Sequence, residues 1–272
     1  MSQHEDLLIE ELPVSLEFNG DHGSSAIVMM ATPRDLEAFA LGFALTEGII
    51  DHPDQMLELH AVPAECGIGV VMTLADGLWQ RAQARKRDKA AASSCSLCGL
   101  ADMQAALHAP HVAATALRFT PAAITAAFKT LPALQTIGQQ TGAAHAAAFV
   151  DSQGNILAIA EDAGRHNALD KLVGMMAQRG LQPSDGFCAI TSRASFEMVQ
   201  KAARVGFPML CAISAPTALA VRLAHESGIT LCGFVRGTMA DARFTCFSHG
   251  YRILHIPPQT EPQTHPQIQY QL

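Results

Sequence analysis

Three apolar runs without a charged residue decide the expected fold of this 272-residue chain: Phe187–Thr191 (FCAIT), Met209–Ile213 (MLCAI) and Ile229–Val235 (ITLCGFV). Runs of this length with no polar face are typical of strands covered on both sides. Between them the sequence predicts helices, from about Ser195 to Arg204 and from Thr217 to Ser227. Strands that alternate with helices in this way predict an α/β fold, with a mostly parallel sheet between helices on both faces.

The same pattern extends to both sides of these runs. Ala143–Val150 and Asn155–Ala160 are expected to be strands joined by a turn, and Ala168–Gln178 to be a helix with one apolar face. Phe244–Phe247 and Tyr251–Ile256 are expected to complete the sheet. These elements together form the larger part of the chain.

A smaller α+β unit precedes the sheet. Short strands are expected at Ala26–Ala31, Met56–Val62 and Gly67–Leu74. Thr32 and Pro33 have the pattern of a helix start, with Thr32 as the capping residue. Asp76 and Gly77 are typical of a hairpin turn.

The chain is therefore expected to have four parts. These are a small N-terminal α+β domain (1–92), a mobile arm (93–118), an α/β domain (119–256) and a disordered tail rich in Pro and Gln (257–272).

The composition describes a compact globular protein, with 49% hydrophobic and 16% charged residues. A formal net charge of −7 gives no reason to expect broad nucleic-acid binding. No stretch approaches the roughly 18 consecutive apolar residues of a membrane span, and the N-terminus lacks the regions of a signal peptide. Seven cysteines, mostly without paired spacing, fit a reducing compartment. We therefore expect a cytoplasmic protein with no membrane partner.

The arm contains the motif Ser93–Gly99 (SSCSLCG), in which Cys95 and Cys98 lie three positions apart. Five basic residues precede it: Arg81, Arg85, Lys86, Arg87 and Lys89. That stretch has no apolar periodicity, so we expect the thiols on an exposed loop. Nearby cations stabilise a thiolate, which is the nucleophilic form of cysteine. The first hypothesis is a reactive Cys95.

Three other interpretations of the thiols stay open. Cys95, Cys98, His108 and His111 could bind zinc, although their spacing is shorter than that of the usual zinc-finger pattern. A thioredoxin-like dithiol would need a strand immediately before the pair, and none is predicted there. The thiols could also be surface residues without a function.

Polar segments follow four of the predicted strands, at 161–167, 191–195, 214–217 and 234–237. Because ligands bind beyond the carboxyl ends of parallel strands, Arg165, His166, Arg193 and Arg236 are candidates for a phosphate or nucleotide pocket. The alternative is that these segments are ordinary helix caps and solvated loops. A P-loop is absent, and so is the His-x-Glu motif of zinc deaminases.

These motifs resemble a known family, the formate dehydrogenase accessory sulfurtransferases (FdhD). The similar stretches are Phe39–Phe43, Glu47–Ile50, Ser93–Gly99, Asp162–Gly174, Ser192–Lys201, Ser214–Leu219 and Gly228–Gly237. The resemblance implies a cytidine-deaminase-like three-layer α/β sandwich without the deaminase zinc site. It also implies a cytoplasmic homodimer that accepts sulfur from a cysteine desulfurase. The sulfur then passes, as a persulfide, to the molybdenum cofactor in its bis(molybdopterin guanine dinucleotide) form, before insertion into formate dehydrogenase.

The resemblance also implies roles for individual residues. Cys95 corresponds to the persulfide cysteine and Cys98 to its partner. The cofactor-binding stretch corresponds to Phe234, Val235, Arg236, Gly237, Thr238 and Met239. The cofactor is the acceptor substrate, and no catalytic metal of the protein's own is expected. The competing hypothesis is a zinc-binding scaffold or chaperone that uses the two thiols with His108 and His111.

Overall fold

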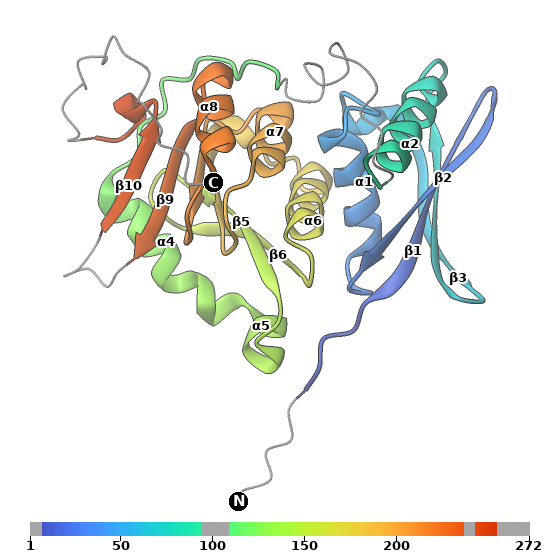
Figure 1. The fold of residues 1–272 in the computed structure, drawn as a ribbon, viewed down its shortest axis with the longest axis horizontal. Coiled ribbons are helices and arrows are strands. Elements are labelled where there is room, and N and C mark those ends of the chain that lie inside the picture. The colour runs from blue at the N-terminus through green and yellow to red at the C-terminus, as the bar shows by residue number, and fades with distance from the viewer. Residues whose placement is uncertain (1–6, 94–108, 237–242, 255–272) are drawn as a thin grey trace, which may run out of the picture.

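The structure is a computed structural model that describes residues 7–93, 109–236 and 243–254. It contains two sheets with helices between them (Figure 1). The N-terminal sheet has the order β2-β1-β4-β3 and comprises β1 (Leu12–Gly20), β2 (Gly23–Ala31), β3 (Met56–Ala64) and β4 (Gly67–Leu74). One face of this sheet packs on α1 (Leu36–Thr46) and on the start of α2 (Trp79–Ser93). A short 3₁₀ turn, η1 (Pro53–Gln55), precedes β3.

The larger sheet has the order β10-β9-β8-β7-β5-β6. Its strands are β5 (His145–Asp151), β6 (Ile156–Asp162), β7 (Gly186–Ile190), β8 (Met209–Ala212), β9 (Thr230–Arg236) and β10 (Arg243–Ser248). Only the pairs β7–β8 and β8–β9 are parallel, whereas β5 and β10 pair antiparallel to their neighbours. The prediction of a mostly parallel sheet is therefore wrong, although β6, β7, β8 and β9 all run in the same direction.

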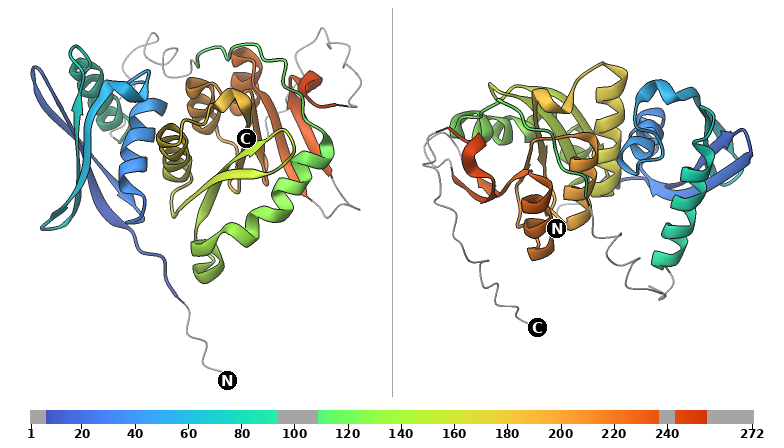
Figure 2. Two further views of the ribbon diagram at one scale, coloured as in Figure 1. Left: turned by 180° about the vertical axis from the view of Figure 1, so that it is seen from behind. Right: turned by 90° about the horizontal axis from the view of Figure 1, so that it is seen from above.

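Helices cover both faces of this sheet, so the predicted three-layer α/β sandwich is confirmed (Figure 2). One face packs on α6 (Arg165–Gln178), α7 (Phe196–Val205) and α8 (Ala218–Ser227). The other packs on α4 (Pro121–Leu134), which is followed by α5 (Thr136–Thr141). Two 3₁₀ turns, η2 (Pro183–Asp185) and η3 (Gly250–Arg252), complete the described elements. The strand predicted to begin at Tyr251 is not formed there, because η3 occupies this position and Ile253 makes only an isolated bridge to Phe119.

The helix start predicted for the N-terminal unit is wrong for a physical reason. Thr32 does not cap α1, which begins at Leu36 after Asp35 in a left-handed conformation. Instead the Thr32 hydroxyl accepts a hydrogen bond from the backbone of Ala163 in the other unit. Strand β1 was not predicted.

The Asp76-Gly77 turn leads into a helix, not a hairpin, and the basic stretch that follows it is part of α2. Leu78, just before this helix, and Ala82 on it are buried, and Arg81 pairs with Asp51 at 2.7 Å. Contacts with residues distant in the chain, both apolar packing and ion pairs, thus stabilise a helix whose own sequence has no apolar periodicity.

Helices α1 and α6 pack against each other between the two sheets (Figure 1). Two glycines make the contact possible. A Cβ atom on Gly42 would lie 1.7 Å from the carbonyl oxygen of Asp170, and one on Gly174 would lie 1.8 Å from that of Ala38. The two backbones therefore approach as closely as residues without side chains allow.

Buried charges reinforce the same interface. The ammonium of Lys201 on α7 lies 2.8 Å from both carboxylate oxygens of Asp170 on α6 and 2.9 Å from Glu47, which follows α1. The Asp170 and Glu47 carboxylates raise the pKa of Lys201 although burial opposes this. Arg85 on α2 pairs with the same Glu47. A second buried pair, Lys171 with Asp162 at 2.7 Å, lies beside it.

Replacing Gly174 by alanine should destabilise the protein, because the added methyl group forces α1 and α6 apart. We expect the free energy of unfolding, measured by urea denaturation, to fall by about 1–3 kcal/mol. Gln178→Ala is the matched control, since Gln178 is exposed on the same helix and its loss should change stability by less than about 0.5 kcal/mol. A Gly174→Ala variant as stable as the parent would contradict the close helix contact.

Candidate functional site

The ends of four strands meet at one edge of the larger sheet, because β6, β7, β8 and β9 run in the same direction. Backbone hydrogen bonds connect the segments that follow them. Thr217 donates to Ala194 at 3.0 Å, and Phe234 donates to Ser214 at 3.2 Å. The four polar segments singled out in the sequence therefore lie along this edge, which we call the carboxyl edge.

The candidate basic residues do not form a single cluster on the carboxyl edge. Arg165 and His166 follow β6, whereas Arg236 ends β9. Four strand spacings separate β6 from β9, which corresponds to roughly 19 Å. Sequence reasoning missed this separation because β5 inserts between β6 and β7. The edge therefore presents two basic groups, one at each end.

The first group surrounds the start of α6. The Nε2 atom of His166 lies 2.9 Å from the carboxylate of Glu197 on α7. Arg165 and His166 both act electrostatically on His145, at the start of β5. Burial lowers the pKa of His145, and the two neighbouring charges lower it further. The Nε of Arg165 and the hydroxyl of Ser195 are buried without a hydrogen-bond partner among the described residues. Unsatisfied polar atoms beside helix N-termini are suited to an anionic ligand.

The second group lies where β9 pairs with β10. A cavity of about 330 Å³ is lined by Phe234, Arg236, Arg243, Phe244 and Thr245. Arg236 and Arg243 lie opposite each other in register, and Arg236 donates hydrogen bonds to the backbone carbonyls of Ile213 and Val235. Phe234 is 45% exposed and has a φ of 55°, which is a strained conformation for a phenylalanine. An exposed aromatic ring beside two guanidinium groups can stack on a base and bind phosphate.

The remaining candidates belong to neither basic group. Arg193 is exposed on the loop after β7, and Val235 is buried in the core beneath α4, so Val235 does not line the cavity. Cys95, Cys98, His108, Gly237, Thr238 and Met239 lie outside the described residues. Sequence reasoning included Ser195 in the segment 191–195 but missed His145 and Arg243, since only the strand pairing brings these two to the edge.

His111, the fourth residue of the zinc hypothesis, lies at the opposite edge of the sheet. Its ring packs against Gly228, and the adjacent Val112 donates a backbone hydrogen bond to Ser227 at 2.8 Å. Within the described ranges, no three His, Cys, Asp or Glu side chains are close enough together to hold a metal ion. In the same ranges, no helix is both long and apolar enough to cross a membrane.

The basic stretch before Cys95 is partly neutralised by ion pairs. Two of the five upstream cations are not available to a thiolate, because Arg81 pairs with Asp51 and Arg85 pairs with Glu47. Lys86 is exposed, and the side chains of Arg87 and Lys89 lie outside the described residues.

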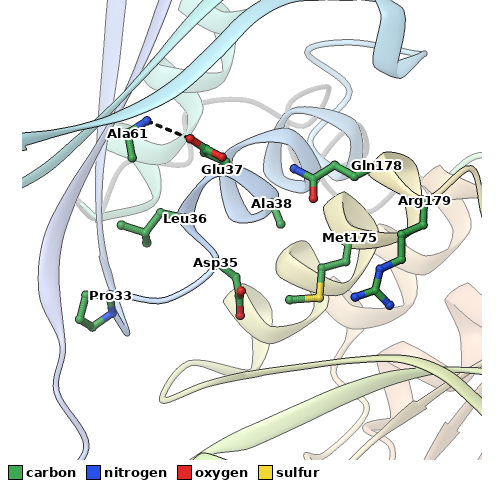
Figure 3. Close-up of a pocket in the computed structure, with 9 residues that line it drawn as sticks. All are labelled: Pro33, Asp35, Leu36, Glu37, Ala38, Ala61, Met175, Gln178 and Arg179. Carbon is green, nitrogen blue, oxygen red and sulfur yellow. Dashed lines mark hydrogen bonds between the residues drawn. The ribbon is translucent and has the colours of Figure 1, made fainter.

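A second cavity, of about 440 Å³, lies between the start of α1 and the end of α6 (Figure 3). Asp35 and Glu37 lie on one side of it and Met175 and Arg179 on the other. Glu37 is already engaged, since its carboxylate accepts a hydrogen bond from the backbone of Ala61 at 3.4 Å. This cavity was not predicted from the sequence, because the two helices that form it are far apart in the chain.

The sequence matches a known family over most of its length. The model of the FdhD/NarQ family matches residues 9–254, and the chain belongs to this family. It is 42% identical over 249 residues to a sulfur carrier protein FdhD from Xanthomonas campestris, covering 92% of this chain and 86% of the relative. It is also 42% identical over 250 residues to a sulfur carrier protein FdhD from Cupriavidus necator, covering 92% and 84%.

The fold is also similar to that of a solved structure. This is a crystal structure described as that of a formate dehydrogenase accessory protein from Desulfotalea psychrophila. The TM-score is 0.67 at 23% identity, and the match covers 92% of this chain and 91% of that one. The family expected from the sequence motifs is confirmed by the family model and by the two relatives.

The pKa of His145 reports on the first basic group. Because this pKa is lower in the folded protein than its ordinary value of 6.5, protonation of His145 opposes folding, increasingly so as the pH falls below 6.5. Arg165→Ala should move the midpoint of the His145 titration, measured by NMR, upward towards 6.5. Arg193→Ala is the control, since Arg193 is not among the charges that act on His145. An unchanged midpoint in Arg165→Ala would show that the two side chains are not neighbours.

Proposed function

We propose that this protein is a sulfurtransferase that serves formate dehydrogenase. In this proposal Cys95 accepts the terminal sulfur of a cysteine desulfurase persulfide and passes it to the molybdenum cofactor in its bis(molybdopterin guanine dinucleotide) form. Membership of the FdhD/NarQ family and the name of the relatives, sulfur carrier protein, support the general role. The observation that supports the acceptor is the carboxyl edge, with a basic group at each end.

The sulfur-loading step needs a nucleophilic thiolate. The thiolate of Cys95 attacks the outer sulfur of the desulfurase persulfide, the bond between its two sulfurs breaks, and the desulfurase thiolate leaves. Atoms and charge balance without an oxidant. Cys98, three residues away, is suited to attack the inner sulfur of the Cys95 persulfide, which forms the Cys95–Cys98 disulfide and expels the outer sulfur as hydrosulfide. Cys98 is therefore a candidate for the release step.

The acceptor is an extended polyanionic ligand with two guanine nucleotides, each joined through a pyrophosphate. A ligand of this length suits an edge whose basic groups are roughly 19 Å apart. Phe234 is positioned to stack on a base, and Arg236 and Arg243 to bind phosphate, in the cavity between β9 and β10. Arg165, His166 and Ser195 would hold the other end, where buried polar atoms have no described partner. We propose that these residues bind and orient the cofactor while it receives sulfur.

The partners follow from the same proposal. A cysteine desulfurase donates sulfur, the catalytic subunit of formate dehydrogenase receives the finished cofactor, and the protein acts as a homodimer in the cytoplasm. The zinc-scaffold hypothesis is the competing one, and it predicts close to one zinc ion per chain in the purified protein.

Arg236→Ala should weaken the binding of GDP, used as the probe for the guanine nucleotide end of the cofactor. Loss of a charged hydrogen bond costs about 1.5–3 kcal/mol, so the dissociation constant measured by calorimetry should rise roughly ten- to hundredfold. Arg179→Ala is the matched control, because Arg179 is an exposed arginine at the end of α6 and away from the carboxyl edge. Equal affinities for all three proteins would place the nucleotide elsewhere.

Cys95→Ala should abolish sulfur loading without unfolding the protein. Incubation of the parent with a desulfurase and free cysteine should add the mass of one sulfur to the peptide that contains Cys95, measured by mass spectrometry. Cys66→Ala is the control, since Cys66 is an exposed free cysteine with no proposed role. Cys98→Ala should still load sulfur. Persistent loading in Cys95→Ala, or stoichiometric zinc bound by the parent, would refute the proposed role of this thiol.

A further inference from the structure

One arginine at the opposite edge of the larger sheet is buried with no acidic partner among the described residues. Arg252 is only 1% exposed, and its guanidinium donates hydrogen bonds to the carbonyl of Gly228 at 2.9 Å and to the hydroxyl of Thr230 at 3.1 Å. Its Nε is buried and has no hydrogen-bond partner among the described residues. The titratable side chains that act on Arg252 are those of Tyr251 and Arg118, and no described carboxylate is among them.

Other basic side chains gather around this arginine. The guanidinium carbons of Arg252 and Arg118 lie 4.7 and 5.6 Å from the centre of the Tyr251 ring. The His249 ring lies 5.8 Å from the same ring and 5.0 Å from the ring of His225. His111 packs against Gly228, whose carbonyl accepts from Arg252. We call these six side chains the basic patch: His111, Arg118, His225, His249, Tyr251 and Arg252.

The patch is assembled from three separate parts of the chain. His111 and Arg118 precede α4, His225 ends α8, and the other three residues follow β10. Arg118 is held in place by hydrogen bonds to the carbonyls of Thr115 and Leu117, and His249 Nε2 donates to the carbonyl of His225 at 2.8 Å. Most of these groups are exposed at the surface above the buried Arg252. The side chains are therefore ordered by the protein itself.

Such an arrangement is unfavourable unless an anion completes it. A desolvated guanidinium is normally paired with a carboxylate, and a second cation beside it raises the cost of its charge. Accordingly, burial lowers the pKa of Arg252, and the nearby Arg118 lowers it further. Burial likewise lowers the pKa of His249, and the charges of His225, Arg252 and His111 add to this effect. An oxyanion would satisfy the guanidinium donors and remove the repulsion.

From this geometry we infer a second anion site on the protein, in which the basic patch binds the phosphate group of a small ligand. Phosphate is favoured over a carboxylate because two guanidinium groups lie against one tyrosine ring with an imidazole ring beside it, and phosphate offers more oxygen atoms to such donors. The site lies at the amino end of β9, whereas the cofactor proposed above binds beyond its carboxyl end. The inference therefore does not depend on the proposed function.

The test is a titration of the full-length protein with inorganic phosphate and, separately, with glycerol 3-phosphate, followed by the NMR signals of the histidine rings. Saturable shifts of the His249 signals are expected with at least one of the two probes. Tighter binding of glycerol 3-phosphate would indicate a phosphate monoester as the ligand, and equal binding would indicate the free anion. Both outcomes support the site.

Arg118→Ala should weaken this response at least tenfold. Arg118 is an exposed side chain, so its replacement should leave the fold intact, whereas Arg252→Ala would disturb the core. Arg179→Ala is the matched control and should respond as the parent does. His249 signals that do not move with either probe, or that move equally in Arg118→Ala, would overturn the proposal. Shifts confined to His145 and His166 would assign phosphate binding to the carboxyl edge and would also overturn it.

Discussion

The contact between α1 and α6 is the constraint on which the rest of the structure depends. Helix α1 packs on the N-terminal sheet and α6 on the larger sheet. Gly42 and Gly174 let the backbones of the two helices come into contact. Lys201 then bridges Asp170 and Glu47 within the same interface. Buried ion pairs contribute little net stability, but removing one partner leaves a buried charge uncompensated. The arrangement therefore favours a single relative position of the two sheets over alternatives.

The relative position of the two sheets also determines where the residues of α6 lie. Its first turn carries Arg165 and His166 to the carboxyl edge, and its middle carries Asp170 into the interface. Glu47, which accepts from Lys201, also pairs with Arg85 of α2, the helix that leads into the thiol-bearing segment. One set of buried charges therefore fixes α2 relative to the helices that border the carboxyl edge.

Much of the fold could be predicted from the sequence, namely wherever the local pattern of apolar residues matches their burial in the folded protein. The runs Phe187–Thr191 and Met209–Ile213 are apolar because both faces of the sheet are covered, so their pattern alone indicated buried strands. Helix α2 could not be predicted, since two of its cations are neutralised by Asp51 and Glu47, which lie 30 and 38 residues away in the chain. The insertion of β5 between β6 and β7 was equally invisible, because strand order is set by tertiary pairing. That order places Arg165 and Arg236 at opposite ends of the edge.

The central claim is that sulfur bound to Cys95 passes to a cofactor held at the carboxyl edge. A single-turnover experiment tests it directly: the protein is loaded with ³⁵S through a desulfurase, freed of donor, and mixed with the molybdenum cofactor in its bis(molybdopterin guanine dinucleotide) form. The account predicts that the label leaves the protein and is recovered with the cofactor, and that Arg236→Ala, loaded equally, transfers it more slowly. Label that stays on the protein, or leaves only as free sulfide, would contradict the account.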